Sequence, residues 1–139
     1  MRTGIVVQIV IVCLIMIGGY EAILGFRQLY GFSVSNHSLY ALTGSFYNPG
    51  PYMGYLAMVL PVCVYVYING MTRIMVMPRY LAGAVGLMIL CLLPSGMSRS
   101  AWVAAIVSVG YVMAMHYRVR IREWMSHHKR TAIGIAVAA

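Results

Sequence analysis

Long apolar runs separated by short polar gaps dominate the sequence. Four of these runs are almost free of charged residues, and they cover about residues 4–26, 52–70, 80–98 and 100–117. A helix needs roughly 20 residues to cross the hydrocarbon core of a bilayer, with about 17 to 25 tolerated, so each run is long enough to span. We therefore expect an all-α, polytopic integral membrane protein with four transmembrane helices.

A fifth apolar run begins at residue 131 and reaches Ala139, where the sequence stops. A helix of half the spanning length cannot satisfy its last carbonyls in lipid, so we expect residues 1–139 to form a single transmembrane region of a larger multi-spanning protein. The first run follows Arg2, but it is long for a secretory leader and lacks a small-x-small cleavage site. This favours a retained helix.

Composition supports a membrane protein and excludes several other classes. The chain is 62% hydrophobic and 9% charged, has a mean hydropathy of +0.84, and contains only two acidic residues, Glu21 and Glu123. That is too little polar surface to cover a soluble core. The net charge of +8 lies in the gaps between apolar runs and not on a polar, aromatic surface, which excludes nucleic acid as the partner.

The sequence shows no signal for a metal or a cofactor. The three cysteines lie inside apolar runs and are odd in number, so we interpret them as small apolar side chains and not as a disulfide set or a metal site. Nucleotide-binding glycine loops, zinc patterns and Ser/His/Asp sets are missing from the sequence. We expect neither a metal nor a cofactor.

The distribution of basic residues predicts the orientation in the membrane. Eight of the ten Lys and Arg residues lie near the N-terminus or in the gaps after the second and fourth runs. The positive-inside rule places these gaps and the N-terminus in the cytoplasm. Arg27, Arg99 and residues 32–51 are then expected to face outward.

Arg99 lies in a short stretch between two predicted spans. A guanidinium fixed at a membrane surface is a fork of hydrogen-bond donors suited to a phosphate or a carboxylate, which indicates an anionic, lipid-borne ligand. The alternative is an interfacial arginine that reaches the lipid headgroups and anchors a helix end. Position alone leaves both interpretations open.

The outward gap before the second run is rich in turn-forming residues. Asn48, Pro49, Gly50 and Pro51 predict a defined turn followed by a helix that opens on proline, and the amides of such a helix start favour an anion. Ordinary turn chemistry explains the same residues, and Gly50 with Gly54 is also a small-residue pair suited to helix packing. The turn and Arg99 are nevertheless predicted on the same side of the membrane.

Glu21 and His37 are two further polar residues with expected surroundings. An ionised carboxylate near the hydrocarbon core is costly unless it is paired or hydrated, so we expect Glu21 to face Arg27, Arg99 or an aqueous cavity. His37 is expected in the outward gap, ahead of the turn, and we interpret it as an ordinary loop histidine.

Two segments resemble known signature regions. Residues 43–49 (TGSFYNP) with 54–57 (GYLA), and then 98–102 (SRSAW), are similar in order and in predicted sidedness to the two signatures of the O-antigen ligase and polymerase superfamily. The chain departs from the family pattern at Gly50, where a second asparagine is frequent, and at Ser100, where glycine is common.

The resemblance implies a specific chemistry. Members of this superfamily are metal-independent glycosyltransferases of the bacterial inner membrane that move a glycan from undecaprenyl diphosphate to an acceptor such as lipid A core, another repeat unit or a protein hydroxyl. It implies that Arg99 is the catalytic residue and binds the lipid diphosphate, with Arg27 as a second cation and Asn48 in the same site. The acceptor-activating histidine of the family is expected outside this chain. Ligase, polymerase and protein O-oligosaccharyltransferase remain open.

A second class of function also remains. A small non-catalytic membrane subunit would use small-residue faces such as Gly50/Gly54 and Ala101/Ala105 to pack on partner helices. A phosphate-binding site would separate the two classes.

Overall fold

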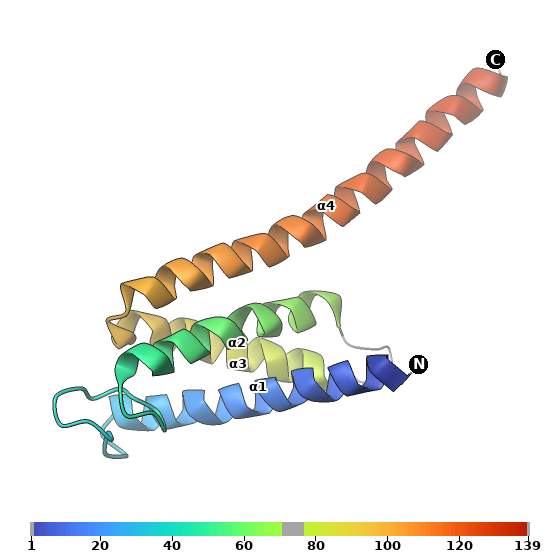
Figure 1. Ribbon diagram of the computed structural model, residues 1–139. Coiled ribbons are helices and arrows are strands. Elements are labelled where there is room, and N and C mark those ends of the chain that lie inside the picture. The colour runs from blue at the N-terminus through green and yellow to red at the C-terminus, as the bar shows by residue number, and fades with distance from the viewer. Residues whose placement is uncertain (1, 71–76, 139) are drawn as a thin grey trace. The chain divides into compact units, whose positions relative to one another are not determined.

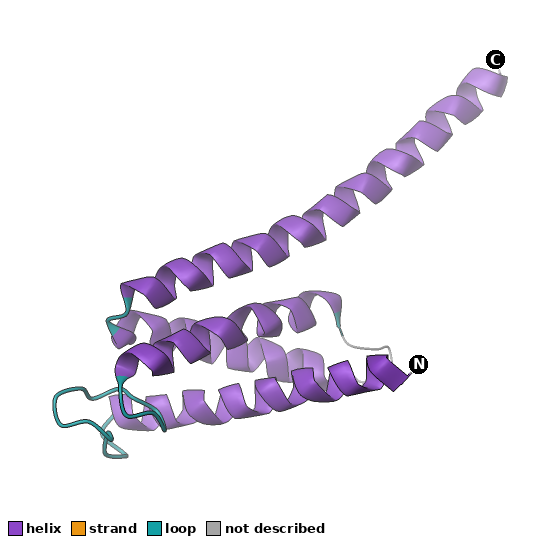
Figure 2. Cartoon of the chain, in the orientation of Figure 1, coloured by secondary structure: helices purple, strands orange, loops and turns teal. Residues whose placement is uncertain are grey.

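The structure is a computed structural model that describes residues 2–70 and 77–138, with side chains described for 4–70 and 79–118. All regular structure in these ranges is helical, as Figure 2 shows. The elements are α1 (Arg2–Leu29), α2 (Pro49–Asn69), α3 (Met77–Leu92), the short 3-10 helix η1 (Leu93–Gly96) and α4 (Arg99–Ala138).

Within the described residues, four helical segments are long and apolar enough to cross a bilayer, namely Gly4–Leu29, Pro49–Asn69, Arg79–Gly96 and Arg99–Arg118. This confirms the prediction of an all-α, polytopic membrane protein. The second helix begins at Pro49 and not at residue 52, because Asn48 serves as its N-cap and a proline suits the first helical position.

The chain forms two compact units, Met1–Val109 and Gly110–Ala139, and the boundary between them falls within α4. This helix continues through the basic stretch as far as Ala138. The apolar run expected to start a fifth span at residue 131 is therefore the last part of α4, and no loop precedes it in the described backbone. Membership of all 139 residues in one transmembrane region stays a prediction.

In the first unit α1, α2 and α3 pack pairwise against one another. Two adjacent glycines let α1 approach both neighbours closely. A Cβ on Gly18 would lie 2.6 Å from Cγ1 of Val59 in α2, and a Cβ on Gly19 would lie 3.0 Å from Cγ2 of Val85 in α3. Small residues at helix contacts are typical of membrane bundles, where van der Waals packing drives association.

The core of the first unit is apolar and lies among these three helices and η1. Its largest fully buried side chains include Ile15, Tyr52, Met53, Leu56, Leu60, Ile89, Leu92 and Leu93. The other face of α1 exposes apolar side chains such as Ile9, Val10, Met16 and Ile17. Such a face suits contact with lipid tails, as expected for a spanning helix.

The helices of the first unit alternate in direction, which brings four chain segments to one end. The end of α1, the start of α2, η1 and the start of α4 lie there, together with the loop of residues 30–48 (Figure 1). The three residues predicted to bind a lipid diphosphate, Arg27, Asn48 and Arg99, are all on these segments.

Candidate functional site

The loop of residues 30–48 starts from a glycine-terminated helix. Gly31 has a φ of +76°, and its amide donates to the carbonyl of Gln28 at 3.1 Å. The amide of Phe32 donates to the carbonyl of Arg27 at 2.7 Å. A left-handed glycine of this kind satisfies the last carbonyls of a helix and turns the chain away from its axis.

Gln28 of α1 holds the loop at Thr43 and Gly44. Its Oε1 accepts the amides of Thr43 and Gly44 at 2.9 and 2.7 Å. Its Nε2 donates to the carbonyl of Gly44 at 2.9 Å and more weakly to that of Val34 at 3.4 Å. Gln28 is buried, so these bonds replace water that cannot reach the backbone.

Glu21, also buried, lies two helical turns before Gln28 on the same face of α1 and binds the next loop residue. Its Oε2 accepts the amide of Ser45 at 3.0 Å, and its Oε1 accepts the Ser45 hydroxyl. Among the described side chains Glu21 makes no ion pair. The expectation that it faces Arg27, Arg99 or an aqueous cavity was wrong, because the polar loop backbone satisfies the carboxylate instead.

Gly44 of the loop packs against Tyr52 of α2. Gly44 has a φ of +59°, and a Cβ there would collide with the ring of Tyr52. The Tyr52 ring is fully buried, and its hydroxyl donates to the backbone carbonyl of Glu21 at 2.8 Å. The segment TGS at 43–45 is thus held between α1 and the first turn of α2, and this fixes where α2 begins.

Asn48 is the N-cap of α2, with extended backbone angles of φ −119° and ψ 145°. Its side chain makes no capping hydrogen bond and is exposed. The amide group of Asn48 is therefore available to a ligand at this end of the unit.

Ser98 caps α4 and thereby places Arg99. The hydroxyl of Ser98 accepts the amide of Ala101 at 3.4 Å, and its carbonyl accepts the amide of Trp102 at 3.3 Å. Met97 before it has a left-handed φ of 50°, which turns the chain sharply from η1 into α4. Arg99 is the first residue of α4, is exposed, and has no interaction partner among the described residues.

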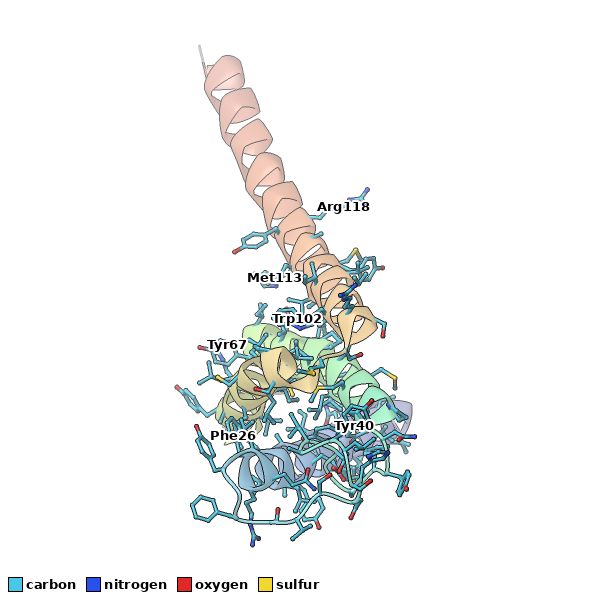
Figure 3. All side chains as sticks on the ribbon, turned by 90° about the vertical axis from the view of Figure 1, so that its left-hand side faces the viewer. Phe26, Tyr40, Tyr67, Trp102, Met113 and Arg118 are labelled. Carbon is cyan, nitrogen blue, oxygen red and sulfur yellow. The ribbon has the colours of Figure 1, made fainter. Side chains whose placement is uncertain are left out.

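Arg27 is exposed in the last turn of α1. The structure brings Arg27, Asn48 and Arg99 to one end of the first unit but records no contact among their side chains. Figure 3 looks onto this end: Phe26 and Tyr40 lie on the α1 side, and Trp102, near the start of α4, lies on the other side.

His37 is part of the loop, as expected, and packs between two tyrosines. Its ring centroid lies 4.9 Å from that of Tyr40 and 5.2 Å from that of Tyr47. Its Nδ1 accepts the amide of Leu39 at 3.0 Å, so the neutral ring carries its proton on Nε2. The residues around it, 34–41, line a cleft of about 430 Å³.

Sequence reasoning missed Gln28. The signal was present, because Glu21 and Gln28 are seven residues apart and so share one face of an otherwise apolar helix. Two polar residues on one face of a spanning helix indicate a polar neighbour. The spacing does not say which of the loop residues that neighbour is.

The described residues contain no group of three or more His, Cys, Asp or Glu side chains placed to hold a metal ion. Cys13, Cys63 and Cys91 are free thiols. Comparisons of the chain with protein-family models, with curated proteins and with solved structures found no match.

Proposed function

We propose that the chain belongs to a membrane glycosyltransferase of the O-antigen ligase type, which transfers a glycan from undecaprenyl diphosphate to an acceptor on the periplasmic face of the bacterial inner membrane. The N-terminus is then cytoplasmic. One observation carries the proposal: segments 43–49 and 98–102, which resemble the two signatures of that superfamily, lead into helices that start at the same end of the first unit (Figure 1). An O-antigen polymerase or a protein O-oligosaccharyltransferase would use the same donor site.

The electrostatics of this end favour an anionic donor. No acidic residue occurs between Glu21 and Glu123, and Glu21 is buried against Ser45. Exposed Arg27 and Arg99, together with the starts of α2 and α4, therefore provide more positive charge at this end than the buried carboxylate of Glu21 offsets.

In the proposed reaction the leaving group is the lipid diphosphate. Charge grows on its oxygen as the glycosidic bond breaks, and a guanidinium already oriented at the first turn of α4 stabilises that charge with little reorganisation. Arg99 fills this role, and Arg27 and Asn48 contribute further donors to the diphosphate. Glu21 and Gln28 act through the 43–45 segment and so position the start of α2.

The test is Arg99→Lys in the chromosomal copy of the gene. Lysine keeps the charge but loses the bidentate fork, so we expect glycan transfer to fall at least about a hundredfold while the protein level in the membrane is unchanged. Arg79→Lys is the matched control, because Arg79 lies at the start of α3, in the gap predicted to be cytoplasmic and away from Arg99. The Cζ atom of Arg79 lies 5.7 Å from the ring centroid of Tyr67. Unchanged glycan ladders in Arg99→Lys would remove the main support for the proposal.

A non-catalytic membrane subunit is the second candidate, and one observation favours it. A Cβ on Gly50 or Gly54 would meet no atom within 4 Å, so this small-residue face of α2 is open. The other small-residue pair, Ala101 and Ala105, is already buried within the first unit. In this reading Gly54→Ile would dissociate a complex detected by native mass spectrometry in detergent, whereas Arg99→Lys would change nothing.

A further inference from the structure

The loop of residues 30–48 has an unusual distribution of side chains. Leu42 and Phe46 pack on the core, but three other apolar side chains are among the most exposed in the first unit, with Phe32 at 75%, Leu39 at 82% and Val34 at 91% of full exposure. Tyr30 and Tyr47 are also largely exposed. A loop in contact only with water would show the opposite preference, because each of these side chains gains from burial.

Several polar side chains of the same loop are bonded within the protein. Asn36 donates through Nδ2 to the carbonyls of Ser45 and Phe46 at 3.2 and 3.3 Å, and the hydroxyls of Ser35 and Thr43 bond each other at 3.0 Å. Further in, Gln28 and Glu21 satisfy the backbone of residues 43–45. Polar groups that satisfy one another while apolar groups face outward are typical of a segment in an apolar or interfacial environment.

The position and charge of the loop agree with such an environment. Because it joins two spanning helices, α1 and α2, it lies at the membrane surface. In Figure 1 and Figure 3 it extends along the α1 side of this end instead of covering the ends of α2 and α3. Residues 30–48 contain no Asp, Glu, Lys or Arg, whereas Arg27 beside them is exposed.

From these observations we propose that the loop of residues 30–48 is a lipid-binding element, which inserts Phe32, Val34 and Leu39 into the headgroup region of the bilayer next to α1. Ile17 and Ile23 of α1 are exposed as well, so the helix before the loop also offers apolar side chains to lipid. The tyrosines Tyr30, Tyr40 and Tyr47 take the place that amphipathic rings prefer at the membrane interface. Arg27 binds anionic headgroups at the same level. The inference depends on the spanning helices and not on glycan transfer.

Depth-dependent fluorescence quenching tests the proposal. Phe32→Trp and Leu39→Trp are each made in a background in which Trp102 and Trp124 are replaced by Phe, and the proteins are placed in nanodiscs of phosphatidylethanolamine and phosphatidylglycerol. We expect lipids brominated near the headgroup to lower the emission of both loop tryptophans by about half, and iodide quenching to fall about threefold relative to free tryptophan. Ile23→Trp, at an exposed position near the loop end of α1, serves as the control for a lipid-facing position.

Loop tryptophans that iodide quenches as strongly as free tryptophan, and that brominated lipid leaves unchanged while it quenches Ile23→Trp, would overturn the proposal. The loop would then be surrounded by water, and its exposed apolar side chains would be a binding surface for a protein partner. Should either variant misfold, methyl resonances of Val34 and Leu39 in the unsubstituted protein give the same answer. Broadening by a headgroup spin-labelled lipid supports insertion, and broadening only by a soluble gadolinium chelate contradicts it.

Discussion

Replacement of Gln28 by leucine should release the loop from α1. Leucine fills a similar volume but leaves the amides of Thr43 and Gly44 without the acceptor that now lies 2.9 and 2.7 Å away. A buried donor without a partner costs about 1–3 kcal/mol, so the two donors together cost about 2–6 kcal/mol. The carbonyl of Gly44 loses less, because Asn36 is a second, longer donor to it at 3.5 Å.

The loss of stability in Gln28→Leu should appear first as local opening of the loop, since α1, α2 and α3 pack through other side chains. Hydrogen exchange of the peptide containing Thr43 and Gly44 measures that opening directly. A loss of 2 kcal/mol corresponds to exchange that is about thirtyfold faster, because 1.4 kcal/mol is a factor of ten. Gln28→Glu should fall between wild type and leucine, since it keeps an acceptor for the two amides but loses the donor to Gly44.

Arg27→Gln is the matched control on the neighbouring residue of α1. The Arg27 side chain is exposed, so exchange of residues 43–45 should stay within about threefold of wild type. If exchange of residues 43–45 in Gln28→Leu also stays within about threefold of wild type, Gln28 does not hold the loop on α1.

Three further outcomes are expected. Gly44→Ala should destabilise the protein by about 2–5 kcal/mol in detergent unfolding, because it combines a left-handed backbone with overpacking against Tyr52, whereas Gly50→Ala should change stability by less than about 0.5 kcal/mol. Ser98→Ala removes the cap of α4 and should cost about 1 kcal/mol, seen as faster amide exchange in the first turn; unchanged exchange would show that the cap contributes nothing. Glu21→Gln keeps an acceptor for Ser45 and should leave the topology unchanged in a protease-protection assay, so failure of membrane insertion would contradict the assignment.

Hydropathy was sufficient to predict the spanning helices. Apolar runs of the right length with few charged residues occur where the structure has α1, α2, α3 with η1, and the first part of α4. The local signals at the helix starts were also readable: Pro49 follows the N-cap Asn48, and Ser98 lies immediately before α4. Both kinds of signal depend on residues close together in the sequence.

The partners of polar residues could not be read in the same way. Glu21 was expected to face an arginine, but it binds Ser45, which is 24 residues away. Polar residues on one face of a helix show that a polar neighbour is needed. The sequence does not distinguish among the many loop residues that could be that neighbour. The left-handed backbone angle at Met97 could not be predicted from the sequence either, because methionine has no preference for that conformation.

The end of the first unit that carries Asn48 and Arg99 is the proposed binding site for a lipid diphosphate. The most direct measurement is binding of undecaprenyl diphosphate to the protein in nanodiscs by native mass spectrometry, with undecaprenyl monophosphate as the competitor. We expect the diphosphate to bind the wild-type protein, to bind Arg99→Gln at least about tenfold more weakly, and to bind Arg79→Gln as it binds wild type. Equal binding by wild type and Arg99→Gln would contradict it.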